Sequence, residues 1–198
     1  MAFKYAVVLT GGIATGKSTA TTLLSLYGFR FIDADKITHQ ILDASSDKIA
    51  DLFGSEYVAG GKVDRAKLGK LVFADKVRRQ ELEALLHPLI YDEIARLSEE
   101  QDRFKKPYII DIPLFFEGDR YPIGKSIVIY APREKQLERL MKREGFSKEE
   151  ARRRIESQMD IEEKRKRATW VIDNSGDLKQ LQQECDRVKD EILSAFAE

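Results

Sequence analysis

Residues 5–19 read YAVVLTGGIATGKST, an apolar run followed by a glycine-rich stretch that ends in lysine, serine and threonine. The segment Gly11–Ser18 satisfies the pattern GxxxxGK[ST]. It follows a predicted strand, Tyr5–Leu9, and opens a predicted helix at Lys17, which is the context that the pattern requires. Glycines let backbone N–H groups turn towards phosphate oxygens, and the positive end of the helix dipole adds to their attraction. The stretch therefore predicts a phosphate-binding loop on an α/β core.

This loop predicts a site for ATP and Mg²⁺. Lys17 is expected to reach the β and γ phosphates, Ser18 to give an oxygen to Mg²⁺, and Thr19 to contact the α phosphate. The expected nucleotide-binding residues of the loop are Gly12, Ile13, Ala14, Thr15, Gly16, Lys17, Ser18 and Thr19.

Short apolar runs alternate with helical patterns along the rest of the chain. Five runs are predicted strands of one parallel sheet: Tyr5–Leu9, Phe29–Ile32, Pro107–Ile112, Ser126–Tyr130 and Trp170–Ile172. Between Asp33 and Lys106 the sequence is helical in character, with no convincing strand. We expect a single α/β domain of the P-loop kinase type, with a five-stranded parallel sheet flanked by helices, a helical acceptor-binding insertion and a helical lid. The expected parts are a nucleotide core (about 1–35, 107–132 and 168–198), an acceptor region (36–106) and a lid (133–167).

The lid is predicted from its charges. Residues 133–167 hold thirteen Lys or Arg against nine Asp or Glu, and Ser147 and Glu150 have the spacing of a capping box at a helix start. A local positive excess suits a cover over phosphates, and the alternative is a solvated helix pair with alternating charges.

Composition limits the other functions. Thirty-four Lys and Arg cancel thirty-four Asp and Glu, so the chain offers no global field for nucleic acid or an anionic membrane. No run approaches the roughly 20 apolar residues of a membrane span. The single Cys185 excludes an intramolecular disulfide, suits a reducing compartment, and falls on an apolar stripe that runs from Leu178 to Phe196. We expect a cytoplasmic protein that acts on a small molecule, without nucleic-acid or membrane partners, as a monomer or weak homo-oligomer.

Two further patterns narrow the class. Asn174 is the only asparagine and is followed by Ser-Gly, so the guanine-reading NKxD motif of switch GTPases is absent, as is the LSGGQ signature of transporter ATPases.

Kinases that act on alcohols gain from a carboxylate beside the γ phosphate. Asp33 and Asp35 end the second predicted strand on the edge of the loop, although either could instead cap the following helix. Asp111, at the end of the third strand, is a competing acid of the Walker B type.

Six ordered segments together resemble the dephospho-coenzyme A kinase family. They are TGGIATGKST at 10–19, IDAD at 32–35, VDRAKLGKLVF at 63–73, LEALLHPLI at 82–90, IPLFFE at 112–117 and VIDNSG at 171–176. The resemblance implies ATP-dependent phosphorylation of the ribose 3′-hydroxyl of dephospho-coenzyme A, the last step of coenzyme A biosynthesis. Another P-loop small-molecule or nucleoside kinase and a nucleotide-dependent binding protein are the alternatives.

The resemblance also implies roles for single residues. Asp35 becomes the general base, with Lys17 and Arg143 as further catalytic residues. Expected acceptor-binding residues are Asp33, Arg65, His87 and Leu114. Arg139 is expected at the ATP phosphates and Asn174 at the adenine through its backbone.

Several of these assignments have alternatives or depart from the family pattern. His87 precedes Pro88 and could pack a helix junction, and the two lid arginines could pair with Glu138 or Glu144 on the surface. Ala14 and Thr15 replace a glycine and a serine of the family loop, and Asp160 stands where proline is common. The family mostly has an apolar residue at Asp111, which leaves that carboxylate as a candidate ligand of a metal-bound water.

Overall fold

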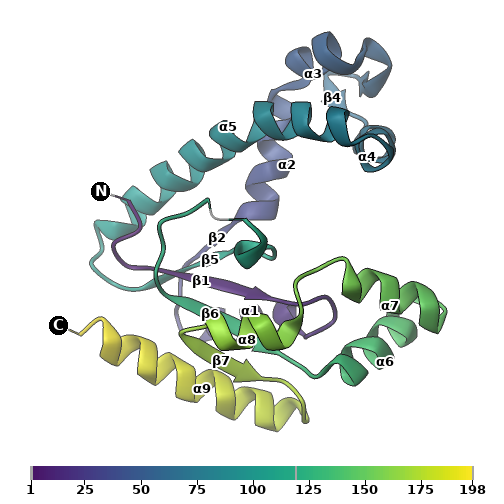
Figure 1. Ribbon diagram of the computed structural model, residues 1–198. Coiled ribbons are helices and arrows are strands. Elements are labelled where there is room, and N and C mark those ends of the chain that lie inside the picture. Colours follow the sequence, from purple (N-terminus) through teal and green to yellow (C-terminus); the bar gives the residue numbers. More distant parts are fainter. Residues whose placement is uncertain (1, 119, 198) are drawn as a thin grey trace. The chain divides into compact units, whose positions relative to one another are not determined.

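The computed structural model describes residues 2–118 and 120–197 (Figure 1). The chain divides into two compact units, one formed by Met1–Ile32 with Ser98–Glu198 and the other by Asp33–Leu97.

A five-stranded parallel sheet forms the centre of the first unit. Its strands are β1 (Ala6–Gly11), β2 (Phe31–Asp33), β5 (Tyr108–Asp111), β6 (Ser126–Tyr130) and β7 (Trp170–Asp173), in the order β2-β5-β1-β6-β7. In the central strand β1, every residue is buried, as expected for a parallel sheet with both faces covered. All five predicted strands are therefore confirmed, and β1 continues into the first glycine of the loop.

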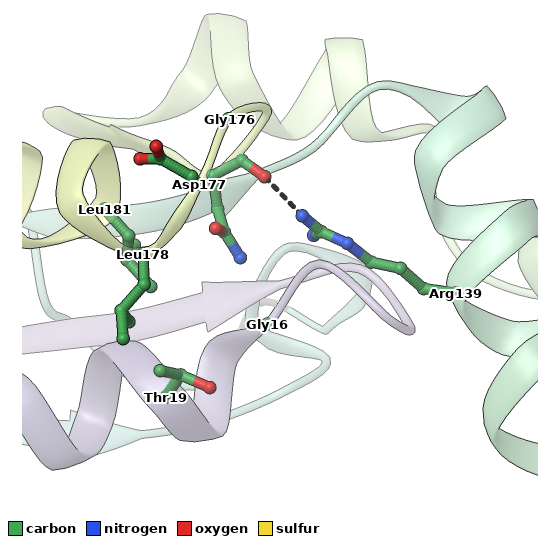
Figure 2. A pocket seen from close by; sticks show the side chains of 8 residues that line it. Gly16, Thr19, Arg139, Gly176, Asp177, Leu178 and Leu181 are labelled. Atoms are coloured by element: carbon green, nitrogen blue, oxygen red, sulfur yellow. Dashed lines mark hydrogen bonds between the residues drawn. The ribbon is translucent and has the colours of Figure 1, made fainter.

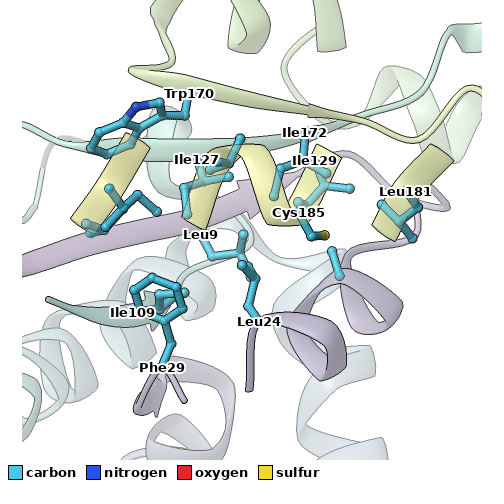
Figure 3. Close-up of a cluster of buried hydrophobic side chains, with 14 residues drawn as sticks. Leu9, Leu24, Phe29, Ile109, Ile127, Ile129, Trp170, Ile172, Leu181 and Cys185 are labelled. Atoms are coloured by element: carbon cyan, nitrogen blue, oxygen red, sulfur yellow. The ribbon is translucent and has the colours of Figure 1, made fainter. Parts of the chain in front are cut away.

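Helices cover both faces of this sheet. On one face, Ile127 and Ile129 of β6 pack in a buried core with side chains of α1 (Lys17–Leu26) and α9 (Leu178–Ala195). Figure 3 shows this core, with Cys185 of α9 among the strand side chains. Val128 points to the opposite face, where it packs in a cluster with Ile161 of α8 (Ile161–Arg167).

The apolar stripe of α9 holds with one exception. The residues Leu181, Cys185, Val188 and Ile192 are buried, and Phe196 packs against the same core. Leu178, expected on the stripe, is 64% exposed because it is the first residue of the helix and lines a surface pocket described below. That part of the prediction is wrong.

Two short helices follow β6 in the expected lid region. The first, α6 (Arg133–Glu144), ends at Gly145 with a φ of 71°, the left-handed conformation that favours glycine at a helix end. The second, α7 (Lys148–Glu156), begins with the predicted capping box, in which Ser147 and Glu150 bond each other's backbone N–H groups. The capping box is confirmed.

The second unit is mainly helical. It contains α2 (Ala34–Ala44), α3 (Ser46–Phe53), the 3₁₀ turn η1 (Ser55–Tyr57), α4 (Arg65–Ala74) and most of α5 (Lys76–Asp102). A small antiparallel hairpin, β3 (Val58–Ala59) with β4 (Lys62–Val63), interrupts the helices. The prediction that this region holds no strand is wrong. Gly60 and Gly61 have φ values of 58° and 75°, so a glycine pair builds the hairpin turn, and that pair was a readable signal.

Candidate active site

The glycine-rich loop joins the end of β1 to the start of α1. Gly16 is the N-cap of α1 with a φ of 91°, and it makes no side-chain cap hydrogen bond to the first amides of the helix. Those amides are the natural partners of an anion at a helix start. A Cβ at Gly16 would overlap the Nδ2 atom of Asn174, so both the backbone angle and the space require glycine here.

The two departures from the family loop have visible consequences. Ala14 has a φ of 60°, a left-handed conformation that costs an L-residue about 1–2 kcal/mol and a glycine almost nothing. Thr15 is fully buried, and both its Oγ1 hydroxyl (2.9 Å) and its backbone N–H (3.3 Å) donate to the carbonyl of Gly12. The threonine thus closes the turn that contains the strained alanine.

Asn174 and Arg139 hydrogen-bond the backbone of the glycine-rich loop. The side-chain amide of Asn174, which is 8% exposed, donates to the carbonyl oxygen of Thr15 at 2.7 Å. Arg139 donates to the carbonyl of Asn174 at 2.8 Å and to that of Thr15 at 3.4 Å. Both side chains therefore donate to the carbonyl of Thr15, and Arg139 also connects that loop to the backbone of Asn174.

A pocket of about 310 Å³ lies beside the start of α1 (Figure 2). Figure 2 shows Arg139 reaching from α6 to the loop after β7, with Thr19 on the α1 side. The lining residues are Gly16, Thr19, Arg139, Asn174, Gly176, Asp177, Leu178 and Leu181. One cavity thus brings together three residues that are expected to bind nucleotide. Thr19 is the last residue of the expected loop set, and Arg139 and Asn174 lie outside the loop.

Lys17 is paired with Asp111. Its ammonium donates to both carboxylate oxygens, and the bond to Oδ2 measures 2.6 Å. The pair arises from the sheet, because Asp111 ends β5 directly opposite Leu9 of β1, two residues before the loop begins. Asp111 is thus the counter-ion of the loop lysine in this structure, a contact that the sequence analysis did not predict.

A buried ion pair near the loop was also missed. Lys164 of α8 is 0% exposed, and its Nζ lies 2.7 Å from Oε1 of Glu117 and 3.0 Å from the carbonyl oxygen of Gly11. It also donates to the carbonyl of Pro113 at 3.4 Å. The signal was weak, because Lys164 stands in the charged run EEKRKR, although it lies one turn after the buried Ile161.

A third contact missed by the sequence analysis involves the residues before α8. Oε1 of Gln158 accepts a hydrogen bond from the backbone N–H of Ile13 at 2.8 Å. The next residue, Met159, donates its backbone N–H to Oε1 of Glu117 at 3.0 Å. Asp160 caps α8 by accepting from Glu162 N at 2.8 Å, a bond that the usual proline could not make.

The residues present fit a magnesium ion that is held mainly by phosphates. Within residues 2–118 and 120–197, no group of three or more His, Cys, Asp or Glu could hold a metal ion by itself. Ser18 is exposed in the first turn of α1, next to the uncapped amides. Mg²⁺ usually takes one or two protein oxygens together with substrate phosphates and waters, so one hydroxyl here is enough.

Two expected residues of the first unit lie at the surface. Arg143, in the last turn of α6, donates to Glu144 at 2.7 Å, which is the surface pairing named as its alternative. Leu114, just before the 3₁₀ turn η2 (Phe115–Glu117), is 51% exposed. Their catalytic and acceptor-binding roles stay predictions.

The expected general base, Asp35, and three expected acceptor-binding residues belong to the second unit. Asp33 caps α2 by accepting from Lys36 N at 2.9 Å, and Asp35 is exposed in the first turn of the same helix. Arg65 pairs with Asp43, and its hydrogen bond lowers the pKa of that carboxyl group. His87 lies within α5, which continues through Pro88, so no helix junction exists for it to pack.

A glycine-rich loop with a lysine and a serine, placed between a central parallel strand and its helix, defines a P-loop nucleotide-binding protein. Residues 5–180 match the family model described as dephospho-CoA kinase, and the chain belongs to that family. The dephospho-CoA kinase of Sulfurimonas denitrificans is 60% identical over 198 residues, which cover 100% of this chain and 99% of the relative.

Two other similar proteins agree. The dephospho-CoA kinase of Wolinella succinogenes is 46% identical over 194 residues, covering 97% of this chain and 96% of the relative. The solved structure of the dephospho-CoA kinase from Campylobacter jejuni has a TM-score of 0.72 and 38% identity, and the match covers 98% of this chain and 100% of that one.

Proposed function

We propose that this chain transfers the γ-phosphoryl group of ATP to the ribose 3′-hydroxyl of dephospho-coenzyme A, giving coenzyme A and ADP. The observation that carries the acceptor is the family match over residues 5–180, which includes the helical unit as well as the loop. The loop by itself supports only the nucleotide, because unrelated functions share it.

The nucleotide would bind along the start of α1. Its phosphates would take the uncapped amides that follow Gly16 and the ammonium of Lys17, which would exchange Asp111 for the β and γ phosphates. The 310 Å³ pocket beside Thr19 and Asn174 has room for the adenine, with Leu178 as an exposed apolar surface. Ser18 would hold Mg²⁺ together with the phosphates, and the ion would supply positive charge that offsets theirs.

The transfer itself would depend on positioning and charge. Asp35 would orient the 3′-hydroxyl and accept its proton, while the γ phosphate passes in line to that oxygen and ADP leaves. Asp33, Arg65, His87 and Leu114 would contact the acceptor. Arg143 would leave Glu144 and offset the charge that develops on the transferred group, with Arg139 behind the loop.

The test is ADP release by the purified protein with ATP, Mg²⁺ and a panel of acceptors. We expect dephospho-coenzyme A to stimulate release strongly, and nucleosides, sugars and shikimate to have little effect. Stimulation by one of the other alcohols would favour a different small-molecule kinase. Slow hydrolysis that no acceptor changes would favour a nucleotide-dependent binding protein.

The proposed setting follows from the small-molecule acceptor. Among residues 2–118 and 120–197 no helix combines the length and apolarity needed to cross a bilayer. We propose that the protein acts in the cytoplasm as a monomer or weak homo-oligomer, with no nucleic-acid partner. Size-exclusion chromatography with light scattering measures the oligomeric state.

A further inference from the structure

The contact between Gln158 and Ile13 fixes the orientation of a side-chain amide at the mouth of the loop. A backbone N–H can only donate, so the atom of Gln158 that meets Ile13 N at 2.8 Å must be the carbonyl oxygen. The amide nitrogen of the same group carries two donors and no acceptor. Because Nε2 and Oε1 share the Cδ atom, the bond to Ile13 also keeps the Nε2 donors of Gln158 next to the phosphate-binding loop.

The segment that carries Gln158 is also tied down directly after the glutamine. Met159 donates its backbone N–H to Glu117, and Lys164, fully buried five residues further on, bonds Glu117 and the carbonyl of Gly11. Because breaking a buried ion pair costs free energy, we expect the segment to stay in place when nucleotide binds. Gln158 would then keep its oxygen on Ile13 and leave its donors for the ligand.

Ile13 is the third residue of the GxxxxGK[ST] pattern, four residues before Lys17, whose ammonium is expected at the β and γ phosphates. An acceptor-only phosphate oxygen at that end of the nucleotide would find the Nε2 donors of Gln158 beside it. A hydrogen bond to a charged oxygen is stronger than one between neutral groups.

We propose that Gln158 is a donor to the γ phosphate of ATP, anchored through its oxygen by the Ile13 amide. This inference rests on the proposed function only in taking ATP as the phosphate donor. It predicts that Gln158 distinguishes ATP from ADP, because only ATP carries the group that Nε2 contacts.

The test compares the affinity of the protein for ADP with its affinity for the β,γ-imido analogue of ATP, by calorimetry in the presence of Mg²⁺. In Gln158→Leu we expect the analogue to bind about 10-fold more weakly while ADP affinity changes less than about twofold. In Gln158→Glu we expect a larger loss for the analogue, because a carboxylate would face the phosphate. Gln183→Glu, an exposed change of the same charge on α9, should leave both affinities unchanged.

The alternatives give different results. If Gln158 only fastens the segment, Gln158→Glu keeps an acceptor for Ile13 N–H, and both ligands bind as in the unchanged protein. If Gln158 competes with the phosphate for that amide, Gln158→Leu binds the analogue more tightly. Either result overturns the inference while the proposed function stands. If the unchanged protein binds neither ADP nor the analogue, the proposed function is overturned and the inference with it.

Discussion

Replacement of Lys164 by methionine tests whether the buried ion pair beside the loop stabilises the protein. Methionine keeps most of the length and the apolar stem of lysine but removes the ammonium group that bonds Glu117 and the carbonyl of Gly11. Loss of one partner of a buried pair costs about 3–5 kcal/mol. Glu117 is 23% exposed and keeps the N–H of Met159, so we expect the lower end, about 3 kcal/mol.

The assay is equilibrium unfolding in urea, with the melting temperature as a second readout. For a chain of this size, about 3 kcal/mol corresponds to a fall in Tm of roughly 6–12 °C. Glu117→Gln should cost a similar amount, because it leaves the fully buried Lys164 without its counter-ion. The double variant should be at least about 2 kcal/mol more stable than the sum of the single losses predicts.

Lys166→Met is the matched control for this prediction. Lys166 lies two residues away in α8 and pairs with Glu163 at the surface, so its loss should leave the free energy of unfolding nearly unchanged. Strictly additive losses for Lys164 and Glu117, or a loss in Lys164→Met no larger than that control, would refute the reasoning.

Three further predictions concern the loop, the proposed base and the core. Asp35→Asn should keep the affinity for ATP but lose at least about a hundredfold in turnover, the usual scale for a removed acid or base; near-normal steady-state turnover would remove Asp35 from that role. Asp111→Asn takes the counter-ion from Lys17 in a partly exposed site, so the nucleotide-free protein should lose about 1–2 kcal/mol of stability, and saturating ATP should narrow the gap between variant and parent in a thermal melt. An equal gap with and without ATP would contradict the exchange of Asp111 for phosphate. Burial raises the pKa of the Cys185 thiol from its ordinary 9.0 to about 12, so its contribution to stability is fully present below pH 9 and is lost as the pH rises towards 12. Above pH 9 the free energy of unfolding should fall more steeply in the parent than in Cys185→Ala, by up to about 1.4 kcal/mol per pH unit, and parallel urea titrations at pH 8, 9 and 10 would count against this.

The sheet was predictable because its signals are local. Each strand is a short apolar run, and β1 is covered on both faces so that all its residues are buried; burial and sequence therefore coincide in this strand. The loop was equally readable, since Gly16 must adopt a φ of 91° and the sequence has glycine there. The hairpin between β3 and β4 was missed because its strands have only two residues each, too few for any periodic pattern.

The contacts around the loop could not be predicted in the same way. Lys17 and Asp111 are 94 residues apart, and Gln158 and Ile13 are 145 apart, so only the finished sheet brings them together. Lys164 resembles its exposed neighbours in the sequence, and only its place on the inner side of α8 distinguishes it. Residue type was sufficient to predict the phosphate cradle, whereas the side chains that hold it depend on packing.

The most direct measurement of the proposed reaction is the position of the transferred phosphate. The purified protein is incubated with ATP, Mg²⁺ and dephospho-coenzyme A, ADP is quantified, and the product is examined by phosphorus NMR. We predict one 3′-phosphate monoester on the ribose for each ADP formed. ADP without a phosphorylated acceptor, or a phosphate on any other hydroxyl, would contradict the proposed function.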